Sequence, residues 1–351
     1  MTPAHLDPAR MPDGETALLK ALLPRVSRTF ALGIRLLPPE LSRSVTIAYL
    51  LCRIADTIED HDTLPAGTRQ ALLAQFATWL RDPPREFSAL LRHFPEPDTD
   101  HQVLVSQVQR VLEAYRGLPG PVQAAIRPPV EEMCAGMAEY AGRGSPGGAP
   151  SQPADLADLE RYCWYVAGTV GWLLTDLFRQ ADGRWSGADY ARLRELSRGF
   201  GLGLQLTNVI RDIGEDRARG VTFIPADLCA VHGVRSDELF TPPRAGETKA
   251  ILGTLADRAG GHLQAGRDYI LALPRRSYRV RLFCLVPLLL AVRTLARVRT
   301  EPAYASGWVR VKLTRAAVRA VVVLSLVIAP SNGLIRGAFR WLGAAPRPQA
   351  A

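Results

Sequence analysis

Two short acidic segments, far apart in the chain, carry side chains whose types and spacing could do chemistry. They read Arg53-Ile-Ala-Asp56-Thr-Ile-Glu59-Asp60 and Asn208-Val-Ile-Arg211-Asp212-Ile-Gly-Glu215-Asp216. In each segment an Asp is followed by carboxylates three and four residues later, so a helix would place all three on one face. Unpaired carboxylates this close repel one another, and Mg²⁺ relieves such repulsion while it binds substrate phosphates. The spacing therefore predicts metal ions that hold a diphosphate.

The ordinary interpretation of one such segment is a solvated, charged helix face. Two features favour a functional site instead. Apolar residues precede each segment, at 48–52 and at 201–206, so we expect the acidic side chains to face inward. Each segment also carries an arginine near its first Asp, Arg53 or Arg211, which could bind phosphate or hold a carboxylate in place.

The composition is that of a globular protein. The 351 residues are 47% hydrophobic and 22% charged, and they suffice for one large domain or two. The net charge of +9 suits anionic ligands or an anionic membrane surface. We expect no nucleic-acid partner, because no zinc-knuckle, basic-zipper or aromatic–basic pattern is present.

The periodicity of the apolar residues is helical almost throughout, without the sustained alternation typical of strands. We expect long helices over about residues 42–62 and 188–217. Their acidic faces would carry Tyr49, Arg53, Asp56 and Asp60 on the first helix, and Gln205, Asn208, Asp212 and Asp216 on the second. We therefore predict a single all-α domain over residues 1–351, with the two Asp-rich helices at the mouth of a central apolar cavity.

Three segments are expected to differ from this helical body. Residues 1–20 are predicted to be a loose N-terminal segment, and the Gly- and Pro-rich residues 142–153 a flexible loop. Within the C-terminal segment 316–351, the apolar stretch 320–329 is too short to span a bilayer. Residues 333–342 mix arginines with apolar side chains, which suits a helix at a membrane interface or one packed on the body.

The cysteines and the N-terminal residues indicate the cellular compartment of the protein. The five cysteines have neither metal-ligand nor redox spacing, so we expect core residues in a reducing environment. The first residues lack the basic-then-apolar pattern of a secretory signal. We expect a cytoplasmic protein, peripheral at the inner face of a membrane where its product would be released. The sequence does not indicate an oligomeric state.

Four segments of the chain, taken in order, resemble the squalene and phytoene synthases, the head-to-head prenyl transferases. They are Ser27-Arg28-Thr29-Phe30, the acidic run 56–60, the tyrosine segment 162–171, and residues 205–220 continuing to 223–225. The resemblance covers roughly residues 25–315. It implies an α-helical isoprenoid-synthase domain that joins two prenyl diphosphates through a cyclopropyl diphosphate, with two or three Mg²⁺ ions.

The resemblance also implies roles for the residues at matching positions. The metal ligands would be Asp56, Glu59, Asp60, Asn208, Asp212 and Asp216. The substrate contacts would be Ser27, Arg28, Phe30, Tyr49, Arg53, Val166, Gln205, Asn208 and Arg211. Besides the four aspartates, the implied catalytic residue is Tyr162, for proton transfer or cation stabilisation. From its segment alone, a core tyrosine with a satisfied hydroxyl is an equal interpretation. Gly168 and Gly171 are expected to allow close helix packing.

Further residues distinguish the squalene branch of the family from the phytoene branch. Residues 282–287 and 177–178 resemble the squalene branch, and so does the basic box 311–315, whose Lys312 and Arg315 would meet the phosphate of NADPH. The box departs from the family pattern at Thr314, where a second basic residue is usual, and the second acidic segment is phytoene-like. We expect a squalene synthase that uses farnesyl diphosphate, Mg²⁺ and NADPH.

Three alternatives remain open. One is a phytoene or dehydrosqualene synthase without a reductant. The others are a Mg²⁺-dependent phosphohydrolase and a non-catalytic membrane or assembly scaffold, although both acidic segments are intact. Arg275, Arg276, Arg279 and Arg281 form a further basic patch, for which we favour a solvated or lipid-facing surface.

Overall fold

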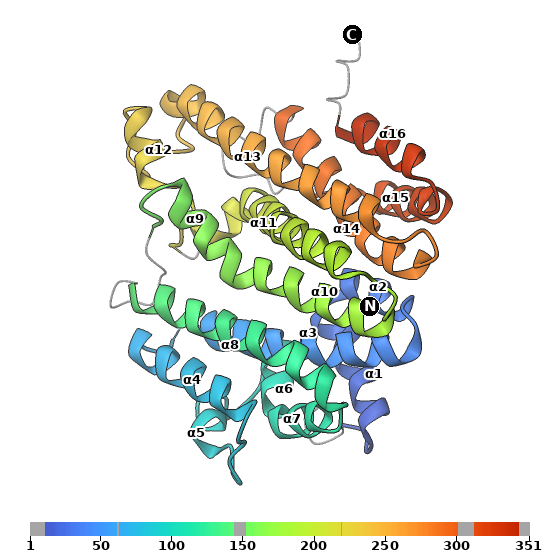
Figure 1. Ribbon diagram of the computed structural model, residues 1–351. Helices are drawn as coiled ribbons and strands as arrows, with labels where there is room; N and C mark the ends of the chain where they lie inside the picture. The colour runs from blue at the N-terminus through green and yellow to red at the C-terminus, as the bar shows by residue number, and fades with distance from the viewer. Residues whose placement is uncertain (1–10, 62, 144–151, 219, 301–311, 344–351) are drawn as a thin grey trace. The chain divides into compact units, whose positions relative to one another are not determined.

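The computed structural model describes residues 11–61, 63–143, 152–218, 220–300 and 312–343 (Figure 1). Within these ranges every regular element is a helix, which confirms the predicted all-α class. In chain order they are α1 (Glu15–Val26), α2 (Arg28–Arg35), α3 (Pro39–Glu59), α4 (Ala66–Trp79), α5 (Ser88–Leu91), α6 (Asp100–Ser106), α7 (Val108–Arg116), α8 (Gly120–Arg143), α9 (Leu156–Cys163), the π-helix η2 (Trp164–Gly168), α10 (Thr169–Ala181), α11 (Gly187–Ala218), α12 (Ala226–Val231), the 3₁₀ turn η3 (Pro242–Arg244), α13 (Ala245–Ala272), α14 (Tyr278–Thr300), α15 (Arg315–Ile328) and α16 (Asn332–Gly343).

The chain forms two compact units. Unit 1 consists of residues 1–148 and 173–184, and unit 2 of residues 149–172 and 185–351. The change from one unit to the other within α10 falls between Trp172 and Leu173. The first Asp-rich helix lies in unit 1 and the second in unit 2. A single domain with one cavity below both helices therefore stays a prediction.

Helix α3 is the buried centre of unit 1. Its apolar side chains include Ile47, Leu50 and Ile54, all completely buried, and it packs against α6, α7 and α8. The helix begins at Pro39, three residues before the predicted start. Proline is tolerated there because the first turn of a helix needs no N–H donor. The predicted helix over 42–62 is thus confirmed, although it ends at Glu59.

The prediction that residues 1–20 are loose is wrong for its last part. Helix α1 begins at Glu15, and its Leu18 and Leu22 are buried. The Glu15 carboxylate accepts two hydrogen bonds from Arg43 of α3, at 2.5 and 2.9 Å. An apolar helix face and a fork-shaped ion pair together order this segment. Residues 1–10 lie outside the described residues.

Helix α11 is the longest element of unit 2, and it packs along α13 (Figure 1). Glycines bring its backbone close to its neighbours. A Cβ on Gly201 would lie 2.4 Å from the Ala167 carbonyl oxygen of η2, and one on Gly203 would lie 2.9 Å from the Leu263 nitrogen of α13. The same holds for Gly171, whose Cβ would lie 2.4 Å from the Ser197 oxygen. The predicted packing role of the glycines in the tyrosine segment is confirmed.

The predicted loop 142–153 is wrong at its start, whereas the prediction for the cysteines is confirmed. Helix α8 runs to Arg143, so the start of the predicted loop 142–153 is helical, and residues 144–151 lie outside the described residues. Gln152 and Pro153 are held by hydrogen bonds to residues 224 and 226. All five cysteines are buried and unpaired, as expected of core residues.

The C-terminal segment forms two helices, α15 and α16, and residues 344–351 lie outside the described part. Among the described helices, none combines the length and apolar character needed to cross a bilayer. One member of the predicted basic patch was wrongly placed. Arg281 has no exposed surface, and it donates hydrogen bonds to helix-end carbonyls where a solvated face was expected. Arg275, Arg276 and Arg279 are exposed as predicted.

A charged cluster joins α9 to α13 in unit 2. Glu160 accepts hydrogen bonds from Arg258, with Nη2 at 2.8 Å and Nε also in contact, and pairs with His262 Nε2 at 2.8 Å. Burial alone would raise the pKa of the Glu160 carboxyl, but the hydrogen bonds and charges of Arg258 and His262 outweigh it and lower the pKa to about 2.

Acid should therefore weaken the contact between α9 and α13. A carboxyl whose pKa is depressed from 4.5 in the unfolded chain contributes stability above pH 4.5 and loses it as the pH falls towards about 2. We expect Glu160→Gln to be destabilised by on the order of 1 kcal/mol at neutral pH, since half-exposed ion pairs contribute little more. The difference from wild type should shrink below pH 4. Urea unfolding at pH 7, 5 and 3 measures it, with the exposed Glu195→Gln of α11 as control.

Candidate active site

In unit 1, the residues of the predicted phosphate-contacting segment meet α3. The Ser27 hydroxyl caps α2 by accepting a hydrogen bond from the Phe30 N–H at 3.1 Å. The Phe30 and Tyr49 rings lie 5.9 Å apart, and the Tyr49 hydroxyl donates to the Val26 carbonyl at 3.2 Å. Burial is the main cause of a raised Tyr49 pKa. Three of the predicted substrate contacts are thus gathered at one place, while the side chain of Arg28 lies outside the described residues.

The first acidic stripe lies at the C-terminal end of α3. Asp56 is half-buried, and Asp60 is exposed and caps the helix. Burial raises the pKa of Asp56, and so does the charge of Asp60, while Arg53 opposes both by donating a hydrogen bond to Asp56 Oδ2 at 3.0 Å. The last turn of α3 has no basic residue, although helix C-termini favour cations. The negative end of the α3 dipole therefore adds to the charge of these carboxylates.

His101 of α6 is a candidate site residue that the sequence reasoning missed. Burial and the charge of Arg53 lower the pKa of the His101 imidazole to about 4, so the ring is neutral at physiological pH. Among the described residues, no hydrogen-bond partner reaches buried His101 Nδ1 or Arg53 Nε. Unsatisfied buried groups are costly, which favours a ligand or water at this position. A lone histidine beside Asp100 carries no spacing signal that could have revealed it.

In unit 2, the tyrosine segment contains the π-helix η2. Tyr162, at the end of α9, is 9% exposed, and its ring stacks on that of Phe223 with centroids 5.1 Å apart. Val166 lies within η2 and is half-buried. Single π-turns in α-helices occur frequently at functional sites, because the extra residue changes which side chains share a face. The stack also assigns a contact to Phe223, the first residue of the matching segment 223–225.

The second acidic stripe lies in the last turns of α11. The Arg211 guanidinium donates to both carboxylate oxygens of Asp212, at 2.9 and 2.5 Å. Asp216 is buried at 7% exposed, whereas Glu215 is exposed. One turn earlier, Asn208 Nδ2 donates to Gln205 Oε1 at 3.4 Å. The predicted residues of this helix therefore follow one another along a single face. Each unit holds an arginine paired with the first Asp of its stripe.

The donors present fit Mg²⁺ bound in part by a substrate. Among the described residues, no three His, Cys, Asp or Glu side chains form a group that could enclose a metal ion by themselves. Mg²⁺ is usually held by one or two carboxylates, with water and phosphate oxygens completing its octahedron. The charge of Asp60 beside Asp56 provides an electrostatic reason for a cation there. The predicted ligand set remains a prediction.

The basic residues predicted to meet NADPH lie at the start of α15. Lys312 and Arg315 are exposed, on either side of the helix N-cap. Thr314, the departure from the family pattern, is that cap, and its Oγ1 accepts a hydrogen bond from the Ala317 N–H at 3.1 Å. A capped helix N-terminus between two cations suits a phosphate group. Val311 lies outside the described residues.

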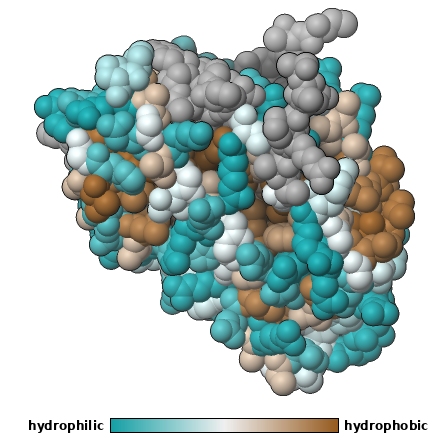
Figure 2. Space-filling model, turned by 90° about the horizontal axis from the view of Figure 1, so that it is seen from above, coloured by the Kyte–Doolittle hydropathy of each residue, from teal (hydrophilic) through white to brown (hydrophobic). Residues whose placement is uncertain are grey.

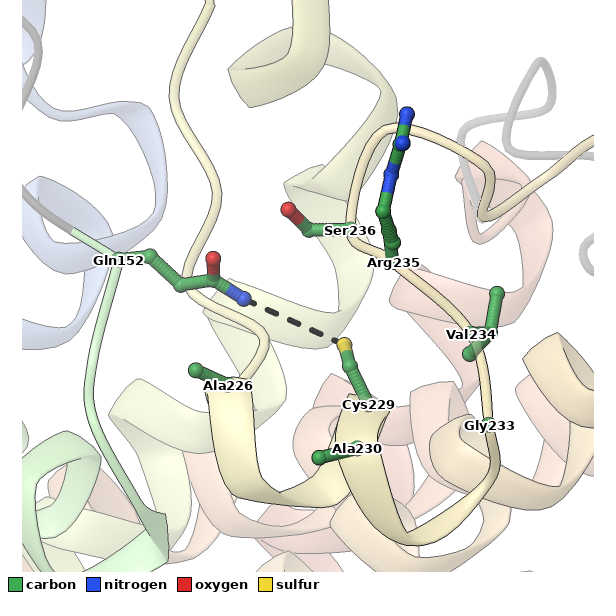
Figure 3. Close-up of a pocket in the computed structure, with 8 residues that line it drawn as sticks. All are labelled: Gln152, Ala226, Cys229, Ala230, Gly233, Val234, Arg235 and Ser236. Atoms are coloured by element: carbon green, nitrogen blue, oxygen red, sulfur yellow. Dashed lines mark hydrogen bonds between the residues drawn. The ribbon is translucent and has the colours of Figure 1, made fainter.

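A cavity of about 410 Å³ in unit 2 contains none of the predicted site residues (Figure 3). It lies between α12 and the loop that follows, where Gln152 and Cys229 point toward each other. Gln152 also donates to the Ile224 carbonyl at 2.9 Å. Burial raises the pKa of the Cys229 thiol, and Arg235 is paired with Asp237. The cavity borders the segment after the second acidic stripe and is not itself the candidate site.

Comparisons with known proteins agree with this arrangement. The model of the squalene/phytoene synthase family matches residues 23–317. The squalene synthase of Nicotiana benthamiana is 30% identical over 297 residues, which cover 83% of this chain and 66% of the relative. The chain thus spans slightly less than two thirds of the length of this relative.

Solved structures show the same fold. TcSQS in complex with the ligand E5700 is 25% identical with a TM-score of 0.81, over 97% of this chain and 94% of the other. A dehydrosqualene synthase has a TM-score of 0.63 at 22% identity, over 93% of this chain and 100% of the other. The fold is therefore that of the all-α isoprenoid synthases. Within that class, the chain belongs to the squalene/phytoene synthase family.

Proposed function

We propose that this chain is a squalene synthase, which condenses two farnesyl diphosphates head to head through presqualene diphosphate. The observation that carries the proposal is the repeated arrangement at the ends of α3 and α11. Each helix ends in a carboxylate stripe whose first Asp is paired with an arginine, Arg53 or Arg211. In a member of this family, that arrangement suits the departure of a diphosphate, and the Nicotiana benthamiana relative is a squalene synthase.

The two stripes would act on the charge of the leaving groups. A diphosphate leaves readily only when its developing negative charge is neutralised. Mg²⁺, held by Asp56, Asp60, Asp212 and Asp216, would supply this neutralisation when bound. Arg53 and Arg211 already donate hydrogen bonds to the carboxylates of Asp56 and Asp212. Guanidinium groups bind phosphate equally well. Each arginine could therefore exchange its carboxylate partner for a substrate oxygen, with Glu59 and Asn208 nearby.

Tyr162 would act on the carbocation that forms when a diphosphate leaves. Its ring is covered on one side by Phe223, which holds the ring in place. The phenol is the candidate acceptor for the proton released when the cyclopropane ring closes, and the ring itself could stabilise positive charge. A cation of this kind reacts with water, so the surrounding surface must be apolar.

The apolar surface would also supply substrate affinity. Burying a C15 chain contributes on the order of 10 kcal/mol at about 0.8 kcal/mol per CH₂, before the costs of ordering. Binding by the chain leaves the diphosphate contacts free to act in the transition state.

The reductant is a second part of the proposal. NADPH would supply a hydride, and Lys312 and Arg315 at the capped start of α15 fit its phosphate. A phytoene or dehydrosqualene synthase is the alternative, favoured by the phytoene-like second acidic segment. We propose a cytoplasmic location, with the protein peripheral at a membrane that accepts the water-insoluble product.

Product analysis tests the reaction directly. Purified protein would receive farnesyl or geranylgeranyl diphosphate with Mg²⁺, with and without NADPH, and extracts would be analysed by gas chromatography and mass spectrometry. We expect squalene with NADPH, and presqualene diphosphate or derived alcohols without it. A C40 product, or a C30 product indifferent to NADPH, would favour the alternative. Absence of any product from folded protein would contradict catalysis, and Asp56→Asn serves as the inactive blank.

A further inference from the structure

The cavity beside α12 is formed by small side chains and by the turn that ends this helix (Figure 3). Within α12, Ala226 and Ala230 are four residues apart and share one face. The chain then turns at Gly233, whose φ of 63° is a conformation that glycine adopts without strain. Arg235 and Ser236 of the following loop form another wall. The volume of about 410 Å³ lies within the range of about 300–1,000 Å³ that is usual for ligand sites.

Gln152 forms a third wall, and backbone hydrogen bonds hold its segment in place. The Ala226 N–H donates to the Pro153 carbonyl at 2.9 Å, and the Asp227 N–H donates to the Ala154 carbonyl at 3.0 Å. These two bonds attach the segment before α9 to the first turn of α12. All the walls belong to unit 2, so the cavity is preformed within one compact unit, as ligand sites usually are.

The described residues that line this cavity are mostly apolar and carry no unpaired charge. Of the eight residues in Figure 3, Arg235 alone is charged, and its guanidinium is paired with Asp237. The Cys229 thiol is neutral at physiological pH because burial raises its pKa. The other polar groups, the Gln152 carboxamide and the Ser236 hydroxyl, are neutral as well. A charged ligand would lose its hydration here without gaining a counter-ion, so the lining favours a neutral ligand.

The Gln152 carboxamide has one strong and one weak hydrogen bond. Its Nε2 donates to the Ile224 carbonyl at 2.9 Å and contacts Cys229 Sγ at 4.0 Å (Figure 3). A thiol sulfur is a weak acceptor, and this contact is long. A hydroxyl oxygen of a ligand would be a better acceptor for the second N–H. The ligand's own O–H then has an acceptor in the Ser236 hydroxyl, which Figure 3 shows directed towards Gln152.

We propose that this cavity is a second binding site, for a small neutral molecule with a hydrocarbon body and one hydroxyl group. The body contacts Ala226, Ala230 and Val234, and the hydroxyl group binds to Gln152. Burial of such a body is the main source of affinity at small-molecule sites. The neighbouring Val231 is 80% exposed, and Figure 2 shows hydrophobic surface at the left, on the side where α12 lies in Figure 1.

An occupant of this cavity acts on Tyr162 through the segment that follows α11. The Val221 N–H donates to a carbonyl in the last turn of α11 at 2.9 Å, and Gln152 holds the same segment through Ile224. Between these two bonds lies Phe223, whose ring stacks on that of Tyr162. A ligand that fixes the Gln152 carboxamide therefore orders Phe223 and raises turnover. The effect on turnover rests on the proposed function, whereas binding does not.

Binding is tested with three probes that share one body. Cyclohexylethanol, cyclohexylacetate and cyclohexylethylamine differ in their head groups, and ligand-observed NMR with the full chain gives each dissociation constant. We expect the alcohol to bind with a Kd on the order of 1 mM and both ions to bind about tenfold more weakly. Ala230→Phe, which fills the cavity, should abolish this binding, and Gln152→Ala should weaken it by about tenfold. The matched control Ala188→Phe, at an exposed position of α11, should bind like wild type.

The coupling to the segment after α11 has its own measurement. Hydrogen–deuterium exchange of residues 220–228, followed by mass spectrometry, should slow by about fivefold when the alcohol is bound. With farnesyl diphosphate and Mg²⁺, the alcohol should raise kcat and leave KM unchanged. Both responses should be lost in Ala230→Phe. Circular dichroism checks that each variant folds, and Gln152→Ala keeps the proposal testable if Ala230→Phe does not fold.

The outcomes separate this proposal from the proposed function. Exchange and binding are measured without substrate, so a folded protein that binds the alcohol but has no turnover would contradict the proposed function alone. Alcohol bound in the proposed active site stays bound in Ala230→Phe, so the difference between this variant and wild type measures the cavity. Equal binding by the two proteins, tighter binding of either ion, or exchange that the alcohol does not change would overturn the proposal.

Discussion

Asp56→Asn is expected to abolish turnover without reducing the stability of the fold. The carboxylate lies at a helix C-terminus, half-buried and next to Asp60, and each of these features disfavours its negative charge. Neutralising it should leave the free energy of unfolding unchanged or raise it by less than about 1 kcal/mol. The Asn oxygen can still accept the hydrogen bond from Arg53. Turnover should fall by about 10²–10³-fold or more, the usual cost of removing a group that stabilises transition-state charge.

The two readouts together distinguish a functional carboxylate from a structural one. Steady-state kinetics over a range of Mg²⁺ concentrations and urea unfolding would be measured on the same preparations. Asp212→Asn tests the second stripe in the same way. The matched control is Asp82→Asn, which removes an exposed carboxylate just after the end of α4 in unit 1, outside every predicted site. Full activity of Asp56→Asn or Asp212→Asn would rule out the proposed metal role of that stripe.

The Asp-rich helices could be predicted from the sequence because their signals are local. The helical spacing of apolar residues predicted both ends of α3 and of α11 to within three residues. The proline at the start of α3 and the acidic stripes near the two C-termini are also properties of adjacent residues. The order of motifs then indicated the family that the comparisons confirmed. Glycine packing in the tyrosine segment was predictable for the same reason.

Residues that act through distant contacts could not be predicted. His101 is a site candidate only because α6 packs on α3 and brings it near Arg53. The π-turn in η2 contains one extra residue per turn. The spacing of the residues in this segment does not indicate it. The role of Arg281 was predicted incorrectly, since its neighbours 275, 276 and 279 are exposed and suggested one basic patch. Its hydrogen-bond acceptors are 8 to 51 residues away along the chain.

Arg281 is unusual in being a fully buried cation compensated by backbone dipoles. Its Nε donates to the Ala329 oxygen and its Nη1 to the Ile270 and Leu273 oxygens, each at 2.7 Å. Its Nη2 donates to Asn332 Oδ1 at 2.6 Å. Burial lowers its pKa, and no carboxylate of the described residues forms an ion pair with it. The carbonyls lie around the C-terminal ends of α13 and α15, where helix dipoles favour a positive charge.

Arg281→Met should therefore be strongly destabilising, because it leaves these buried oxygens without donors. Breaking a buried charge network typically costs about 3–5 kcal/mol, and we expect a loss in that range in urea unfolding. Arg279→Met, an exposed neighbour on the same helix, should change the free energy of unfolding by less than about 0.5 kcal/mol. Limited proteolysis should cut first between α14 and α16, since Arg281 joins the ends of α13 and α15 to the start of α16.

A milder pair of variants keeps this prediction testable if Arg281→Met does not fold. Arg281→Lys retains the charge but cannot reach four acceptors with one ammonium group, so it should still lose about 2 kcal/mol or more. Asn332→Ala removes a single acceptor and should cost about 1–2 kcal/mol. If both variants matched wild type, the network would not be what holds α15 and α16 on unit 2. If they lose stability as expected, Arg281 anchors the two C-terminal helices α15 and α16 on unit 2.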